Sequence, residues 1–335
     1  MSALTHVRPR ARVRLQGAVV VLVGASSGIG RATALAFAEH GARLVLAARS
    51  GQTLDEVARA CTDRGAVAVA VPTDVADAAA VDALAEVAVE RFGRIDVWVH
   101  DASALIAGPL EATPPEEVRR LIDVNVTGCI NGARTALRTF RTQQQGVLIV
   151  VSSLLGLLPD PALPVYVASK FAARGLALSL HHAVADTPHI RVCLVLPGSV
   201  DTPIFQRAAN HTGRRLRAIP VAYAPERVAA VIVARARRPR RQSTVGLGNR
   251  MLLAGHRLAP RLTEWGVARW SARFLLGHIP EPDETGTLFT AGGGDPVHGG
   301  HRRGRLRSRA GEMFGRWQAR RGAVRRARRR AARTR

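Results

Sequence analysis

The feature that most constrains the fold is a glycine-rich turn between an apolar segment and a helical one. Residues 19–23 read Val-Val-Val-Leu-Val, and Gly-Ala-Ser-Ser-Gly-Ile-Gly follows directly at positions 24–30. Glycines in such a turn let backbone N–H groups at a helix N-terminus approach a pyrophosphate. An apolar run without alternation is typical of a strand that is buried on both faces. The turn therefore predicts a nucleotide-binding α/β protein.

Short apolar runs and helical stretches alternate from residue 18 to about residue 247. Further apolar runs cover residues 44–47, 67–71, 95–99, 147–151 and 191–196, and helical stretches cover about 28–40, 53–64, 77–91, 115–141 and 165–186. Strands that alternate with helices form parallel βαβ units with right-handed crossovers. We therefore expect a doubly wound, mostly parallel Rossmann sheet with helices on both faces.

Changes in composition divide the chain into four segments. Residues 1–14 form a basic N-terminal segment, residues 15–245 the Rossmann-fold catalytic domain, residues 246–300 a C-terminal extension, and residues 301–335 an Arg-rich tail. In the extension we expect Pro260 to divide one helical stretch into two. The Gly- and Pro-rich end of the extension is expected to be loop, and the low-complexity tail to be disordered.

The net charge of +24 is concentrated at the two ends of the chain. Residues 301–335 contain fifteen Arg and one acidic residue, Glu312, and residues 1–14 add four Arg. Three interpretations of the tail stay open: a solvated tail without a partner, weak contact with an anionic membrane surface, or contact with nucleic-acid phosphates. Between the ends the composition is that of an ordinary soluble domain.

Cysteine usage and hydropathy bear on the compartment. Cys61, Cys129 and Cys193 are far apart and odd in number, which indicates neither a disulfide framework nor a metal site. No apolar run reaches 18 residues, so no transmembrane helix is expected. Basic residues 8–14 imitate the start of a signal peptide, but the apolar run after them leads into the glycine turn. We expect a cytoplasmic protein, with a peripheral membrane location left open by the tail.

A tyrosine and a lysine four residues apart indicate the chemistry. Tyr166 is one of two tyrosines, and Lys170 is the single lysine among 49 basic residues. On a predicted helix this spacing places both side chains on one face, where a cation favours the phenolate of a tyrosine. Ser153 closes a predicted strand and can donate to a carbonyl oxygen that gains negative charge, with Ser152 as the adjacent rival.

The end of the second predicted strand indicates the cofactor. It reads Ala48-Arg49, where NAD-selective sites carry an acidic residue for the ribose hydroxyls. The absence of that acid, together with an Arg suited to a 2′-phosphate, predicts NADP(H) in preference to NAD(H).

Three further motifs complete the pattern: Thr-Asp-Val at 73–75, Asp-Val-Asn-Val-Thr-Gly around Asn125, and Pro-Gly-Ser-Val-Asp-Thr-Pro at 197–203. With the glycine turn and the Ser, Tyr and Lys spacing, residues 15–240 resemble the short-chain dehydrogenase/reductase family. The resemblance implies a catalytic tetrad in which Asn125 anchors a water that relays protons through Lys170. The cofactor contacts implied by the turn, the strand ends and the resemblance come from Gly24, Ser26, Ser27, Gly28, Ile29, Gly30, Arg49, Asp74, Val75, Tyr166, Lys170, Pro197, Gly198, Val200 and Thr202.

One departure from the family pattern bears on the cofactor. The family's Asn-Asn-Ala-Gly reads His100-Asp101-Ala-Ser here, and a carboxylate beside an anionic cofactor is expected to weaken its binding. An NADP(H)-binding sensor or scaffold without turnover therefore stays open as the alternative to an enzyme. Apolar residues at 154–158 and 204–205 predict a lipophilic carbonyl or alcohol substrate. The resemblance also implies a homo-oligomer.

Overall fold

The computed structural model describes residues 13–218, 220, 222–292 and 296–300. The chain divides into two compact units, Met1–Gly299 and Gly300–Arg335. The basic tail at 301–335 and all but two residues of the N-terminal segment lie outside the described residues. The predictions made for them stay predictions.

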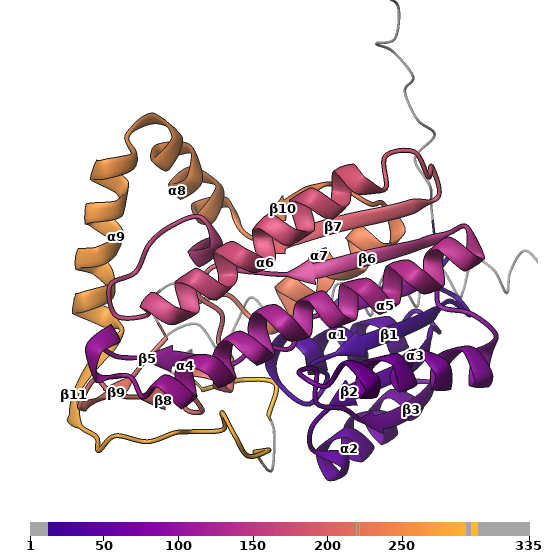
Figure 1. The fold of residues 1–335 in the computed structure, drawn as a ribbon, viewed down its shortest axis with the longest axis horizontal. Helices are drawn as coiled ribbons and strands as arrows, with labels where there is room; N and C mark the ends of the chain where they lie inside the picture. Colours follow the sequence, from indigo (N-terminus) through magenta and orange to yellow (C-terminus); the bar gives the residue numbers. More distant parts are fainter. Residues whose placement is uncertain (1–12, 219, 221, 293–295, 301–335) are drawn as a thin grey trace, which may run out of the picture. The chain divides into compact units, whose positions relative to one another are not determined.

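A seven-stranded parallel sheet forms the centre of the first unit, in the order β10-β7-β6-β4-β1-β2-β3 (Figure 1). Its strands are β1 (Val19–Val23), β2 (Arg43–Ala48), β3 (Val67–Pro72), β4 (Val97–His100), β6 (Gly146–Val151), β7 (Ile190–Leu196) and β10 (Gln242–Thr244). The order reverses between β1 and β4, which makes their carboxyl ends the switch point where such sheets bind ligands. The predicted doubly wound Rossmann sheet is confirmed.

Helices cover both faces of this sheet. They are α1 (Gly28–Ala38), α2 (Gly51–Thr62), α3 (Ala78–Phe92), α4 (Pro115–Ile122), α5 (Gly128–Gln143), α6 (Pro164–Ala183) and α7 (Pro225–Arg237). On one face α1 packs against α7, and on the other α3 packs against α5 (Figure 1). Along β1, Leu22 enters one core with Phe37, whereas Val21 enters the other with Trp98. Burial on both faces explains why the strand runs are apolar throughout.

The stretch predicted as one helix over 115–141 is interrupted. A π-helical turn, η2 (Asp123–Thr127), separates α4 from α5 and carries Asn125. Such turns insert one extra residue per turn and are frequent at functional sites. The periodicity of the sequence gave no sign of this interruption.

The extension belongs to the same compact unit as residues 15–245. Helix α8 (Leu247–Leu258) and helix α9 (Pro260–Phe274) form a hairpin, and Pro260 begins the second helix, as the sequence predicted (Figure 1). Strand β11 (Leu276–Pro280) then pairs antiparallel with β9 (Arg214–Leu216), and β5 (Ile106–Ala107) pairs with β8 (Ala209–Asn210). Among the described residues, no helix combines the length and the apolar character needed to cross a bilayer.

Candidate active site

A polar cleft lies at the carboxyl ends of the strands around the switch point. Gly24 and Asp101 follow the two strands that flank this point, and Arg49 follows the neighbouring strand β2. Of the predicted cofactor residues, Gly24, Ser26, Ser27, Gly28, Ile29, Arg49, Asp74, Val75, Tyr166, Lys170 and Thr202 line the cleft. Pro197, Gly198 and Val200 line an adjoining pocket instead, and Gly30 lines neither.

The glycine turn has the geometry that a dinucleotide requires. Gly24 adopts φ +94°, and a Cβ there would lie 2.6 Å from the backbone nitrogen of Ala102. Gly28 adopts φ +50°, in the left-handed region that favours glycine. A Cβ on Gly30 would overlap the carbonyl of Gly24, so this glycine allows the close packing of strand and helix. The bare backbone at the start of α1 fits the diphosphate of a nicotinamide dinucleotide.

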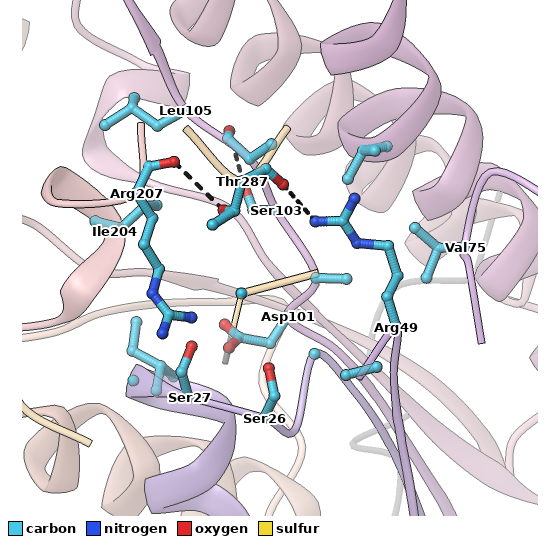
Figure 2. A pocket seen from close by; sticks show the side chains of 18 of the residues that line it. Ser26, Ser27, Arg49, Val75, Asp101, Ser103, Leu105, Ile204, Arg207 and Thr287 are labelled. Atoms are coloured by element: carbon cyan, nitrogen blue, oxygen red, sulfur yellow. Dashed lines mark hydrogen bonds between the residues drawn. The ribbon is translucent and has the colours of Figure 1, made fainter. Parts of the chain in front are cut away.

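Arg49 lines the cleft, but both of its terminal nitrogens donate hydrogen bonds to backbone carbonyls of the chain. Its Nη1 donates to the carbonyl of Leu288 at 2.9 Å, and its Nη2 donates to the carbonyl of Thr287 at 2.5 Å (Figure 2). Burial, followed by the charge of Arg120, lowers the pKa of Arg49. Burial would raise the pKa of Asp74, but a hydrogen bond of 2.5 Å from Arg120 helps hold it below its usual value.

The structure brings three of the four predicted catalytic residues together. Tyr166 and Lys170 lie on α6, with the lysine Nζ 5.5 Å from the centroid of the tyrosine ring, and both are buried. The hydroxyl of Tyr166 is hydrogen-bonded to Ser153, which directly precedes a short helical turn after β6. The rival Ser152 instead donates to the carbonyl of Lys170 at 2.9 Å. Ser153 is therefore the serine that faces the tyrosine.

Burial dominates the electrostatics of this group. It raises the pKa of Tyr166 well above the usual value, and the hydroxyls of Ser153 and Ser103 oppose the shift. Burial also lowers the pKa of Lys170, whereas the nearby carboxylate of Asp101 favours its charged form. A phenol and an ammonium thus lie close together in a site where every added charge has a large effect.

Asn125 braces the site from within the π-helical turn. Its Oδ1 accepts from the backbone nitrogen of Ala104 at 2.7 Å, and its Nδ2 donates to the carbonyl of Ala104 and to Ser169 Oγ, both at 2.9 Å. These bonds join the segment after β4 to helix α6. The side chain is 3% exposed and lines neither cavity, and the predicted water relay stays a prediction.

The His100-Asp101 pair behaves differently from the two asparagines of the family pattern. His100 is buried with both ring nitrogens lacking a hydrogen-bond partner, and burial lowers its pKa to about 3. The ring is therefore neutral near pH 7. Asp101 lines the cleft and accepts the backbone N–H of Gly30 at the start of α1. Burial raises the pKa of Asp101 to about 7, although Lys170 opposes the shift.

An apolar pocket of about 680 Å³ adjoins the cleft, with Ser153 and Tyr166 in its wall. The residues predicted from the sequence, among them Leu154, Leu155, Ile204 and Phe205, line part of it. Another part of the wall comes from the helical extension, chiefly Leu252, Val267, Trp270 and Leu275, which were not predicted as site residues. Their only signal was a set of apolar residues on amphipathic helices, which does not say what those helices cover. Tyr166 lines both cavities.

Comparison with known proteins agrees with this arrangement. Residues 18–213 match the family described as short chain dehydrogenase. The chain belongs to this family. Among solved structures, a short chain dehydrogenase/reductase from Burkholderia phymatum in complex with NAD has 27% sequence identity and a TM-score of 0.69, and the match covers 76% of this chain and 96% of that chain.

Two curated relatives extend the comparison. An uncharacterised oxidoreductase of Bacillus subtilis is 32% identical over 302 residues, which cover 89% of this chain and 84% of the relative. A 3β-hydroxysteroid dehydrogenase of Eggerthella lenta is 38% identical over 223 residues, covering 64% of this chain and 85% of the relative. The first alignment is too long to be contained in residues 15–245, so that relative also shares sequence outside the catalytic domain. The chain is an oxidoreductase of the short-chain type with a nicotinamide-cofactor fold.

Proposed function

We propose that this chain is an NADP(H)-dependent oxidoreductase that interconverts a lipophilic alcohol and its carbonyl, with Tyr166 as the general acid and base. The observation that carries the proposal is the place of Tyr166 in the wall of both cavities, the polar cleft and the apolar pocket. A group at that junction touches both reactants of a hydride transfer. A bound nicotinamide supplies the hydride, and the side chains position the carbonyl and move the proton.

The side chains divide the remaining work. The hydroxyl of Tyr166 protonates the carbonyl oxygen in reduction, and its phenolate accepts the proton of the alcohol in oxidation. Ser153, hydrogen-bonded to the same hydroxyl, donates to the oxygen as negative charge develops. Lys170 supplies a positive charge beside the phenol, which favours the phenolate formed after proton transfer. Asn125 holds the backbone that borders this group.

The proposed preference for NADP(H) rests on Ala48 and Arg49 at the end of β2. NAD-selective sites carry an acidic residue at this strand end, which binds the ribose hydroxyls, and neither residue here is acidic. Arg120 adds a second guanidinium in the same corner and pairs with Asp74. The solved relative from Burkholderia phymatum is in complex with NAD, and the ratio of the Kd values for NADPH and NADH measures the preference of this chain.

The proposed lipophilic substrate rests on the apolar pocket. A volume of about 680 Å³ falls in the range of about 300–1,000 Å³ typical of sites for whole small molecules. Its lining includes Leu154, Leu158, Phe205 and Trp270, with the hydroxyls of the catalytic group at one end. The relative from Eggerthella lenta is named for a hydroxysteroid, a substrate of this apolar kind.

We propose a cytoplasmic homo-oligomer for the protein as a whole. The described cysteines are unpaired and buried, as a reducing compartment allows. For the tail at 301–335 we retain weak contact with anionic membranes or nucleic acid as a proposal that rests on its charge.

The decisive experiment compares the wild type with Tyr166→Phe, using NADPH and a panel of ketones of increasing apolar size. We expect turnover that rises with apolar size in the wild type and falls by about 100-fold or more in the variant, because the general acid is lost. The Kd for NADPH should change little, since the phenyl ring is retained. Tight NADPH binding without turnover on any carbonyl would favour the alternative, an NADP(H)-binding sensor or scaffold. That alternative is supported by Asp101, which stands where the family pattern has an asparagine.

A further inference from the structure

The described C-terminal residues cross the cofactor cleft. After β11 the chain runs as a strap, defined here as residues 281–292, whose Thr287, Ala291 and Gly292 line the cleft. Thr287 lies between Arg49 and Arg207, with hydrogen bonds to both (Figure 2). The strap therefore forms part of the wall of the cleft, between these two arginines.

Carbonyls of the strap and of the residues after it accept hydrogen bonds from donors that a cofactor would need. The carbonyls of Thr287 and Leu288 accept both terminal nitrogens of Arg49. Further along, the carbonyl of Pro296 accepts the backbone N–H of Gly28 at 3.4 Å. Gly28 belongs to the turn whose N–H groups suit a diphosphate, and Arg49 is the residue suited to a 2′-phosphate. Backbone carbonyls thus occupy the positions at which phosphate oxygens would accept these bonds.

The space left in the cleft supports the same conclusion. The cleft has a volume of about 220 Å³, below the roughly 300 Å³ at which sites for small ligands begin. The adjoining apolar pocket is about three times larger, although the dinucleotide is the larger of the two expected ligands. With the strap in place, the cleft encloses less space than ligand sites usually offer.

Contacts on the catalytic domain hold the strap in this position. The side chain of Leu288 is buried with Ile106 and Leu121 in a small core. Glu284 and Asn210 exchange two backbone hydrogen bonds of 2.8 and 3.2 Å. Next to them, the His211 ring lies between two carboxylates: its Nε2 is 2.8 Å from Glu117 Oε2, and its Nδ1 is 3.3 Å from Asp283 Oδ2 of the strap. These contacts are specific enough to give the strap one defined closed position.

We propose that the strap is an autoinhibitory element, which closes the cofactor cleft by taking the hydrogen bonds of the cofactor and which must leave before the dinucleotide binds. The apparent affinity is then the intrinsic affinity multiplied by the fraction of molecules with the strap open. Cofactor concentration, or any partner that holds the strap away, controls how much of the protein is competent.

Gly286 offers a way to dislodge the strap without touching the catalytic group. It adopts φ +51°, and a Cβ there would overlap the carbonyl of Arg207 and lie 2.5 Å from that of Ala208. Gly286→Ala should therefore destabilise the closed position by steric conflict. The matched control is Gly65→Ala, because Gly65 also has a left-handed φ of +84° but no atom within 4 Å of a new Cβ.

The experiment measures the Kd for NADPH by fluorescence on the full chain, together with hydrogen exchange of residues 281–292. For Gly286→Ala we expect a Kd about tenfold lower than in the wild type, the gain when a strap closed about nine-tenths of the time is released. Gly65→Ala should leave the Kd unchanged. In the wild type, added NADPH should increase exchange in the strap, because the cofactor displaces it.

Two outcomes would overturn the proposal. Weaker binding in Gly286→Ala would show that the strap contributes to the cofactor site, and slower exchange on adding NADPH would show that the strap closes over the bound dinucleotide. The proposal rests on the cleft being the cofactor site, and this can fail separately: no NADPH binding in any variant would refute the site rather than the strap.

Discussion

Asp101→Asn is expected to tighten cofactor binding and to remove its dependence on pH. The carboxyl group of Asp101 lines the cleft and accepts the N–H of Gly30 at the start of α1. Helix N-termini favour anions through their unpaired N–H groups and the helix dipole. A cofactor diphosphate at this end of α1 would therefore meet a second anion. Asparagine keeps an oxygen that can accept from Gly30 but carries no charge.

The size of the effect follows from the position of the carboxylate. At a separation of roughly 5 Å and an effective dielectric constant of about 20, two like charges repel by about 3 kcal/mol, roughly a hundredfold in Kd. Lys170 lies near Asp101 and offsets part of this charge. Protonation of Asp101, whose pKa is about 7, limits this cost, so we expect Asp101→Asn to lower the Kd by about tenfold at pH 8.

The sign of the pH dependence follows from the raised pKa of Asp101, about 7. Above pH 7 the group is ionised in the free protein, and binding a polyanion raises its pKa further, so binding takes up a proton. The Kd should thus be nearly constant below pH 7 and should rise by up to tenfold for each pH unit above it. Between pH 6 and pH 8 the expected change is about tenfold.

Titration calorimetry with NADH over pH 6–8 tests this, since NADH lacks the 2′-phosphate, which itself titrates near pH 6. Two buffers of different ionisation enthalpy would report the proton uptake directly. Asp160→Asn is the matched control: Asp160 is also buried with a raised pKa, but it faces Ser271 and the apolar pocket. An unchanged pH profile in Asp101→Asn, or binding weaker than in the wild type, would refute the role given to this carboxylate.

Two further predictions concern the other charged groups of the cleft. Lys170→Arg keeps the charge but should lower kcat by on the order of 100-fold, because a wide guanidinium does not fit the buried position 5.5 Å from the Tyr166 ring; near wild-type turnover in a folded variant would contradict this. Wild-type protein should bind NADPH more tightly than NADH by roughly 1–3 kcal/mol, and Arg49→Asp should erase the difference. Arg49 also holds the strap, so its loss affects the binding of both cofactors alike, and the ratio of the two Kd values is therefore the quantity to compare. Equal affinities for NADPH and NADH in the wild type would contradict the prediction.

The sheet and the catalytic group were accessible from the sequence because their signals are local. Strands buried on both faces are apolar throughout, so β1 and its neighbours were located to within a few residues. Tyr166 and Lys170 were linked by helical spacing, and Ser153 by its place at a strand end. Each of these signals lies within a few residues of the group that it identifies.

The features that the sequence did not reveal depend on contacts between distant residues. The π-helical turn at Asn125 is stabilised by bonds to Ala104 and Ser169, and no local periodicity reports them. The strap was expected to be loop, and loops carry no periodicity that says where they lie. Its position depends on individual bonds, such as those of Arg49 to carbonyls more than 230 residues away. The apolar residues of α9 were visible, but not the pocket that they enclose.

In the cofactor cleft, the hydrogen-bond donors that suit phosphate groups are already bonded to acceptors of the chain itself. Asp101 accepts from Gly30, the carbonyl of Pro296 accepts from Gly28, and the strap accepts from Arg49. A cofactor therefore exchanges hydrogen bonds at these donors, and each exchange contributes far less than a new bond to an unpaired donor would. What such an exchange adds is charge, because a phosphate replaces neutral carbonyls beside guanidinium groups. Affinity in this cleft should accordingly depend on salt and on the charge of Asp101 more than on the number of hydrogen bonds.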